Sequence, residues 1–494
     1  MLEQIVKSTF KYIAEKSKLE RKKIGQFFTS KETARYMARL FDITDFENKS
    51  SISILDPGAG SGILTAALIE RLESECITKR VYITCYENNT DIISLLIKNL
   101  EFIKDNSKLE IDYTICRENY LISQGESFET GTPTREFDLI IGNPPYLKIT
   151  KNSPEALSMP SVCYGAPNLY FLFASMSLFN LKTNGQMVYI IPRSWTSGAY
   201  FRKFRDYFLS NGKLRNIHLF ISRDKLFDNE TVLQETIIVK VEKTNIDYPF
   251  ISMTTSRDGT EFNYVQKLEV PYETAVSGAE KYVYLVTNNE ELEVLNKIDK
   301  FNHTLIDLNL KMKTGITVDF RNREFLREKP GDNIVPLFYS QHIKGGVVEF
   351  PIGKDNEYIM NAKPGLVQEN KNYLFVKRFT SKEEKRRLQC GIYLAENLTN
   401  YSHISTQNKI NFIDSVNNMT VDEFLVLGLY VIFNSTIYDN YYRILNGSTQ
   451  VNSTEINNIP VPQINILREL GEKLKLSNVF SVEMCDSILG GVIK

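Results

Sequence analysis

Residues 51–62 read SISILDPGAGSG, a β-rich apolar run that ends in a turn with three glycines. Residues 63–72 follow with helical spacing and few helix breakers. A strand, a glycine turn and a helix in this order open a Rossmann-like unit, which predicts an α/β fold with a mostly parallel sheet. The glycines let a ligand approach the backbone, and helix N-terminal amides can face a carboxylate or phosphate. The spacing matches neither the dinucleotide fingerprint nor a P-loop, since no Lys-Ser or Lys-Thr follows.

Polar residues also stand at the ends of three further expected strands. These are Glu87 after residues 81–86, Asn119 and Tyr120 after residues 111–116, and Asn143 to Tyr146 after residues 137–142. An acid such as Glu87 can accept both hydroxyls of a ribose. Because ligands bind at the carboxyl ends of the strands of an open parallel sheet, four such ends in order predict a nucleotide-binding site.

The fourth strand end reads Asn143-Pro144-Pro145-Tyr146. Two prolines lock φ and remove two backbone donors, so the chain must leave the strand rigidly. The Asn143 amide and the backbone carbonyls then become fixed polar groups beside an aromatic ring. They could hold a planar amine, with oxygens accepting its N–H bonds and Tyr146 stacking on its face. A simple strand-ending turn is the alternative, because Asn-Pro is a common turn starter.

Together these motifs resemble the amino-group DNA methyltransferases that use S-adenosylmethionine. The likeness rests on Asp56-Pro57-x-x-Gly60-x-Gly62 followed by Asn143-Pro144-Pro145-Tyr146. Upstream, Gly25-Gln26-Phe27-Phe28-Thr29 resembles the motif that contacts the methionine end of the cofactor. This order, with a long tail, matches the gamma class of adenine-N6 enzymes, in particular the BsuBI/PstI-type and TaqI-type modification enzymes. The resemblance covers most of the chain and is most specific between residues 24 and 240.

The resemblance implies roles in cofactor binding. The methionine part would be surrounded by Phe28, Thr29, Asp56, Gly58 and Gly60, the ribose would be held by Glu87, and the adenine would be faced by Asn119 and Tyr120. Many relatives carry an acid where Asn119 stands. An asparagine oxygen can still accept a hydrogen bond from an adenine N6 amine.

The resemblance also implies roles at the target base. Asn143 and the Pro144 carbonyl would bind the target N6 amine, with Tyr146 stacked on the flipped base. Phe227, in a segment that resembles a family hairpin, would offer a ring to the second face of that base; burial in the core is its alternative. Residues 167–179, which include NLYFLFASMSLF, are an expected helix whose apolar stripe we interpret as core.

After residue 245 the pattern changes to short β-like runs, turns and polar aromatics. We therefore expect residues 1–245 to form the S-adenosylmethionine-dependent methyltransferase domain, with an N-terminal helix. Residues 246–494 are expected to form an α+β target-recognition domain that binds DNA. Lys313, Arg443, Gln450 and Asn452 are residue types that read base edges or phosphates, and they lie in patches resembling family recognition domains. For each of them alone, a packing or turn role is the alternative.

The net charge is −1, yet the charges are unevenly distributed. Residues 371–390 carry seven basic and two acidic side chains, and a second basic cluster spans residues 311–329. Basic segments on an acidic background suit a cleft that binds the phosphates of double-stranded DNA. A solvated helix face is the alternative, and for residues 382–387 by themselves it is the favoured one.

The cysteines and the apolar runs indicate the compartment. Six cysteines are spread without a Cys-x-x-Cys pair, so neither a metal site nor a disulfide framework is expected. The expected location is the reducing cytoplasm of a prokaryotic cell. The longest apolar stretch, near residues 426–433, is shorter than a membrane span, so no membrane partner is expected.

The predicted activity is sequence-specific methyl transfer from S-adenosylmethionine to N6 of a flipped adenine in double-stranded DNA. The chain would be the modification component of a type II restriction-modification system, with a cognate restriction endonuclease as its functional partner. The N6 amine is a poor nucleophile, and two oxygen acceptors could localise its lone pair without a metal. The alternatives are a cytosine-N4 methyltransferase, a methylase of the same fold that acts on RNA or protein, and a DNA-binding specificity module with a degenerate methylase half.

Overall fold

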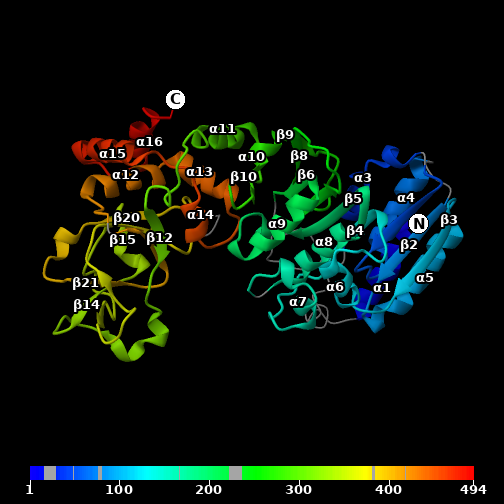
Figure 1. The fold of residues 1–494 in the computed structure, drawn as a ribbon, viewed down its shortest axis with the longest axis horizontal. Coiled ribbons are helices and arrows are strands. Elements are labelled where there is room, and N and C mark those ends of the chain that lie inside the picture. Colours follow the sequence, from blue (N-terminus) through cyan, green and yellow to red (C-terminus); the bar gives the residue numbers. More distant parts are fainter. Residues whose placement is uncertain are drawn as a thin grey trace. The chain divides into compact units, whose positions relative to one another are not determined.

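The computed structural model describes residues 1–15, 29–47, 49–75, 80–165, 167–221, 236–380, 384–417 and 419–493 (Figure 1). The chain separates into two compact units, Met1–Asn288 and Asn289–Lys494.

Within the described residues, the first unit is built on a sheet of nine strands in the order β3-β2-β1-β4-β5-β7-β6-β8-β9. The strands are β1 (Ser51–Asp56), β2 (Arg80–Tyr86), β3 (Glu110–Cys116), β4 (Phe137–Gly142), β5 (Leu181–Pro192), β6 (Lys213–Phe220), β7 (Thr236–Glu242), β8 (Phe250–Ser256) and β9 (Gln266–Pro271). Strands β1 to β5 are all parallel, and β7 is antiparallel to both β5 and β6. The predicted α/β class with a mostly parallel sheet is confirmed.

Two sets of helices pack with this sheet. One set contains α1 (Leu2–Glu15), α3 (Lys31–Arg39), α4 (Ile63–Glu75) and α5 (Thr90–Asn106); the other contains α6 (Tyr120–Thr130), α7 (Pro154–Leu157), α8 (Leu169–Phe179) and α9 (Arg202–Asn211). Short 3₁₀ turns are η1 (Ile43–Phe46), η2 (Pro160–Val162), η3 (Arg193–Thr196) and η4 (Ala199–Phe201). Helices of each set contact one another, α1 and α3 with α4, and α6 and α9 with α8. This is the arrangement of a doubly wound sheet. Helices α4 and α8 confirm the helices expected from residue 63 and at residues 167–179.

The strand order reverses where β1 pairs with β2 on one side and with β4 on the other. A buried carboxylate secures this pairing. Asp138 of β4 accepts hydrogen bonds from the Ser53 backbone N–H of β1 at 2.8 Å and from Lys182 at 2.9 Å. Burial alone would raise the pKa of Asp138, but the bonds from Lys49, Lys182 and Ser53 outweigh burial and lower it to about 2. The carboxyl ends of β1 and β4 are thereby held side by side.

The first unit extends past the division expected at residue 245. Strand β8 pairs in parallel with β6, and β9 pairs with β8, so residues 250–271 belong to the first sheet. The unit then continues through α10 (Tyr272–Ala275), β10 (Val276–Ser277) and β11 (Tyr282–Val283). The sequence does not show this, because a short polar strand has the same residue pattern whether it lies at the edge of an existing sheet or begins a new domain.

Within the described residues, the second unit has two sheets, with strand orders β12-β22-β19-β20-β16-β15 and β13-β17-β14-β21-β18. The strands are β12 (Leu310–Thr314), β13 (Leu326–Arg327), β14 (Ile334–Phe338), β15 (Ile343–Lys344), β16 (Val347–Val348), β17 (Tyr358–Met360), β18 (Gln368–Glu369), β19 (Tyr373–Lys377), β20 (Cys390–Tyr393), β21 (His403–Thr406) and β22 (Ile410–Ser415). The helices and 3₁₀ turns are α11 (Asn289–Ile298), α12 (Glu423–Phe433), α13 (Thr436–Leu445), α14 (Ser453–Asn457), α15 (Ile464–Ser477), α16 (Val482–Gly490), η5 (Asp319–Arg321), η6 (Arg323–Phe325), η7 (Ser340–His342) and η8 (Ala395–Leu398). Strands followed by a group of helices make the α+β arrangement predicted for this half.

Helices α12 and α15 approach each other closely because each carries a glycine at the contact. A Cβ atom added at Gly428 of α12 would lie 1.8 Å from the Leu467 carbonyl oxygen, and one at Gly471 of α15 would lie 1.9 Å from that of Phe424. The long apolar run expected near residues 426–433 is thus a buried helix of this unit. Across the described part of the chain, every helix is too short or too polar to cross a membrane.

Gly428→Ala tests this close contact. A methyl group there meets backbone that cannot yield cheaply, so we expect the free energy of unfolding to fall by roughly 1–3 kcal/mol or more. Gly490→Ala is the matched control, because an added Cβ meets no described atom within 4 Å. Urea unfolding followed by circular dichroism measures both variants, and equal stability of the two would contradict the packing.

Candidate active site

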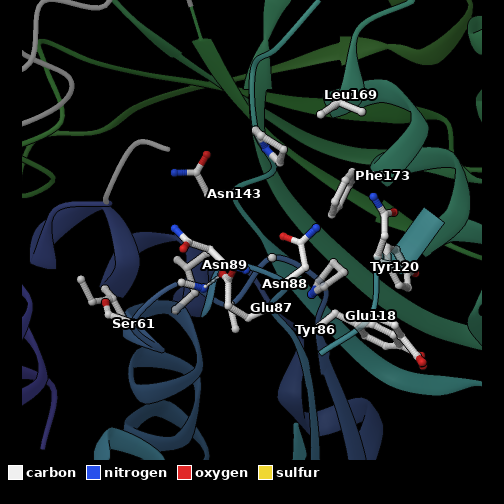
Figure 2. Close-up of a pocket in the computed structure, with 18 of the residues that line it drawn as sticks. Ser61, Tyr86, Glu87, Asn88, Asn89, Glu118, Tyr120, Asn143, Leu169 and Phe173 are labelled. Atoms are coloured by element: carbon white, nitrogen blue, oxygen red, sulfur yellow. Dashed lines mark hydrogen bonds between the residues drawn. The ribbon is translucent and has the colours of Figure 1, made fainter. Parts of the chain in front are cut away.

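A pocket of about 450 Å³ lies at the carboxyl edge of the first unit's sheet (Figure 2). It is lined by Thr29, Pro57, Gly58, Ala59, Gly60, Ser61, Ile63, Leu64, Tyr86, Glu87, Asn88, Asn89, Thr90, Glu118, Asn119, Tyr120, Asn143, Pro145, Glu155, Leu169 and Phe173. The residues that follow β1, β2, β3 and β4 all contribute. The four polar strand ends picked out in the sequence therefore meet at one cavity.

The glycine turn after β1 curves around the pocket. Gly60 and Gly62 have φ of 54° and 83°, in the left-handed region that favours glycine. The turn is tied to the second strand end, because Ala59 N–H donates to the Tyr86 carbonyl at 3.1 Å. The hydroxyl of Thr9 in α1 donates to that of Ser61 at 2.8 Å. Hydrogen bonds to β2 and to α1 thus fix the conformation of the glycine turn.

Glu87 links the second strand end to the glycine turn. One carboxylate oxygen accepts the Gly60 N–H at 2.9 Å, and the other accepts the Asn89 N–H at 2.8 Å. Burial raises the pKa of Glu87. The Asn88 N–H also bonds to this carboxylate. Two carboxylate oxygens have four lone pairs, so Glu87 retains an acceptor site for a ligand's hydroxyl.

Asp56, the last residue of β1, is fully buried beneath the turn. The Thr65 hydroxyl of α4 donates to its Oδ2 at 2.9 Å. Burial is the main cause that raises the pKa of Asp56 to about 7, and the nearby Glu87 carboxylate adds to it, while the Thr65 bond offsets only part. Asp56 is thus an acid whose ionisation is disfavoured inside the fold. It lies behind the pocket wall, outside the lining residues.

Asn143 stands at the end of β4 between two partners. Its Nδ2 donates to the Thr29 hydroxyl at 3.0 Å, and its Oδ1 accepts the Tyr146 hydroxyl at 2.9 Å. The Tyr146 hydroxyl also lies 3.0 Å from the Ile190 carbonyl oxygen. The Tyr146 ring is only 7% exposed and meets Tyr170 edge-on at 6.4 Å. In this state Tyr146 anchors the asparagine rather than presenting an open ring.

Asn119 and Tyr120 reach the pocket at the start of α6. Asn119 Oδ1 caps that helix by accepting the Leu121 and Ile122 N–H groups, and its Nδ2 donates to Glu155 at 3.0 Å. The Tyr120 ring is buried, and its hydroxyl accepts a hydrogen bond from Asn180 at 3.0 Å.

The structure adds lining residues that sequence reasoning missed. Tyr86 and the two asparagines after Glu87 could have been inferred from their place at a strand end. Phe173 belongs to α8, which we interpreted as core, and most of that helix is indeed buried. Its ring nevertheless faces the pocket on the same side as Tyr120, 5.6 Å away between ring centroids (Figure 2). Glu155 lies on the short α7, for which the sequence offers no periodic signal.

Four of the expected DNA-contacting residues lie in the second unit. Lys313 pairs with Asp414 at 2.6 Å, and Arg443 pairs with Asp439 at 2.8 Å. Gln450 and Asn452 flank Val451 in the segment before α14, where Gln450 pairs with Phe379 in an isolated bridge. Phe28 and Phe227 lie outside the described residues.

Known proteins resemble this chain along most of its length. The model of the Eco57I restriction-modification methylase family matches residues 66–227. The chain is 36% identical over 472 residues to the type II methyltransferase M.BsuBI of Bacillus subtilis, covering 93% of this chain and 92% of that protein. It is 33% identical over 463 residues to M.PstI of Providencia stuartii, covering 92% and 90%. The type IIL restriction-modification enzyme MmeI, solved in complex with DNA, aligns with a TM-score of 0.62 and 11% identity over 97% of this chain and 77% of its own, a likeness of fold.

Asp56→Asn tests the buried acid. The folded pKa of about 7 lies above that of the unfolded chain, so between roughly pH 4 and pH 7 the folded state holds a proton that the unfolded state has released. The free energy of unfolding of the wild type should therefore fall relative to that of the variant as the pH rises from about 4 to 7, by at most about 1.4 kcal/mol per pH unit. Above about pH 7 the difference between the two proteins should stay constant.

Urea unfolding at pH 5, 6, 7 and 8 measures this difference. Asp105→Asn, on the exposed last turn of α5, is the control for the effect of an Asp-to-Asn substitution at the protein surface. A difference between wild type and Asp56→Asn that is independent of pH would contradict the perturbed acid.

Proposed function

This chain belongs to the type II DNA methyltransferases of restriction-modification systems, and on that premise we propose that it methylates N6 of an adenine in double-stranded DNA with S-adenosylmethionine as donor. The observation that carries the proposal is the position of Asn143. Its amide stands just after β4 and lines a pocket to which the ends of β1, β2 and β3 also contribute.

The pocket fits the proposed cofactor. Its volume of about 450 Å³ lies within the range of small-molecule sites, and it combines a glycine turn, a carboxylate and aromatic walls. Thr29, Gly58 and Gly60, with the buried Asp56 behind them, would surround the methionine part together with Phe28. Glu87 would hold the ribose, and Asn119 and Tyr120 would adjoin the adenine. When bound, S-adenosylmethionine supplies an electrophilic methyl group on a sulfonium.

Asn143 would bind the target amine. Its Nδ2 bond to Thr29 orients the amide, so that Oδ1 would accept the amine once the Tyr146 hydroxyl donates to the Ile190 carbonyl instead. With the Pro144 carbonyl it would accept both N–H bonds of the amine and localise the nitrogen lone pair for attack on the methyl group. This is positioning and electrostatic preorganisation, with no covalent intermediate on the base.

Tyr146 can release Asn143 at low cost. Its hydroxyl lies within hydrogen-bond distance of two acceptors, so it can donate to Ile190 when a target amine occupies Asn143 Oδ1. To stack on the flipped base, the Tyr146 ring would leave its buried position against Tyr170, and Phe227 would cover the other face of the base. Base flipping costs a few kcal/mol, and stacking recovers roughly 1–3 kcal/mol per ring.

The second unit, from Asn289 onwards, would recognise the DNA sequence, and the boundary of the catalytic part would move from residue 245 to Asn288. The basic segments that begin at residues 311 and 371 lie in this unit. Lys313 and Arg443 would exchange their carboxylate partners for phosphates, and Gln450 and Asn452 would approach base edges. A restriction endonuclease of the same specificity would be the functional partner in the cytoplasm of a prokaryotic cell.

Asn143→Ala separates catalysis from folding and cofactor binding. Removing one preorganised acceptor should lower the methyl-transfer rate about 10²–10³-fold while cofactor affinity stays within about threefold. Transfer from methyl-labelled cofactor to DNA, followed by mass spectrometry of the nucleosides, measures rate and product. Asn106→Ala, on the exposed end of α5, is the matched control.

The product decides between target bases. N6-methyladenine supports the proposal, and N4-methylcytosine would overturn the adenine assignment. Equal, negligible transfer by the wild type and Asn143→Ala on diverse DNA would overturn the enzyme itself.

Thr29→Val tests how Asn143 is oriented. Valine keeps the shape but loses the acceptor for Nδ2, so kcat should fall about three- to tenfold, as for loss of one neutral hydrogen bond, with the KM for DNA little changed. Thr29→Ser retains the hydroxyl and should retain activity. An equal loss in both variants would contradict the orienting role.

A further inference from the structure

The end of β3 brings to the pocket an asparagine whose hydrogen-bonding groups are engaged. Asn119 Oδ1 accepts the Leu121 N–H at 3.1 Å and the Ile122 N–H at 3.3 Å. An amide oxygen has two lone pairs, and the N-cap uses both. Asn119 is therefore poorly suited to accept a further hydrogen bond from a ligand.

A carboxylate from elsewhere in the chain stands beside Asn119. Glu155 lines the same pocket, and its Oε1 accepts the Asn119 Nδ2–H at 3.0 Å. Among the described residues this is the one hydrogen bond of the Glu155 carboxylate. Its other oxygen remains available to a donor in the pocket.

The short helix α7 that carries Glu155 is fixed against α6. A Cβ added at Gly125 of α6 would lie 2.5 Å from the Ser158 Cβ, so the two backbones are in close contact. Just beyond, the Ser161 hydroxyl donates to Glu129 of α6 at 2.7 Å. Ala156 and Met159 are buried. The packing of α7 and the residues after it against α6 therefore holds the Glu155 carboxylate in place.

This side of the pocket also offers flat apolar walls. The rings of Tyr86 and Phe173 flank Tyr120 at 4.8 Å and 5.6 Å, and all three residues line the cavity. Such walls suit a planar heterocycle, whose edge would then meet the polar groups of Asn119 and Glu155.

We propose that Glu155 is the specificity-determining residue that recognises the exocyclic amine of the cofactor's adenine, accepting one N6–H while Asn119 orients its carboxylate. The assignment rests on the proposed function, in which S-adenosylmethionine occupies this pocket. A bond from an amine to a carboxylate is charge-assisted and stronger than one to an amide. A purine with an oxygen at C6 would direct that oxygen at the carboxylate and be rejected.

Calorimetric binding to the full-length protein tests this with two ligands. One is S-adenosylhomocysteine, and the other is its analogue with hydrogen in place of the 6-amino group. The wild type should prefer the amine-bearing ligand about tenfold or more. In Glu155→Ala this preference should fall to within about twofold, with the affinity for the analogue unchanged. Glu155→Gln, which conserves size, should show an intermediate preference.

A rescue variant distinguishes recognition from support of α7. In the Glu155→Ala background, Asn119→Asp should restore the preference, because one aspartate oxygen can cap α6 and the other can accept the amine. Glu126→Gln, exposed on α6 and outside the pocket, is the control and should bind like the wild type.

The opposing outcomes are separable. If Glu155→Ala weakened both ligands equally, or if Glu118→Gln alone abolished the preference, the assignment to Glu155 would be overturned while the proposed function stood. Wild-type protein that bound neither ligand would overturn the proposed cofactor and this assignment together.

Discussion

The pairing of β4 with β1 is the constraint on which the site depends. At this point the strand order of the first sheet reverses, and the buried Asp138 of β4 binds Ser53 of β1 and Lys182 of β5. The pairing aligns the carboxyl ends of the two strands, so the glycine turn and Asn143 reach the same cavity. The glycine turn and Asn143 lie more than eighty residues apart in the sequence, and this strand pairing brings them together.

The strand ends position one another once they are together. Glu87 holds the glycine turn through the Gly60 N–H, and Thr29 and Tyr146 hold Asn143 from two sides. The side chains of the site are therefore already positioned in the folded protein before a ligand binds, which is what a preorganised site requires.

The strand ends that form the site could be predicted from the sequence, because the carboxyl ends of parallel strands lie at one edge of a sheet. Asp56, Glu87 and Asn143 are predicted at that edge and lie there in the structure, with Asp56 just behind the pocket wall. The domain division could not be predicted correctly, because an added edge strand such as β8 has the same local pattern as a strand of a new domain. The role of Phe173 could not be predicted either, since the pattern of an apolar helix does not show which of its rings faces a cavity.

The α/β class, the order of the motifs and the kind of chemistry they support can be read from the sequence, because they follow from periodicity, glycine and proline geometry and residue type. Which groups can still bind a ligand depends on how the folded chain packs. The oxygen of Asn119 is used in capping α6, and the neighbouring carboxylate comes from α7, thirty-six residues further along the chain. Hydrogen-bond partners are set by how distant segments pack, and no local pattern encodes them.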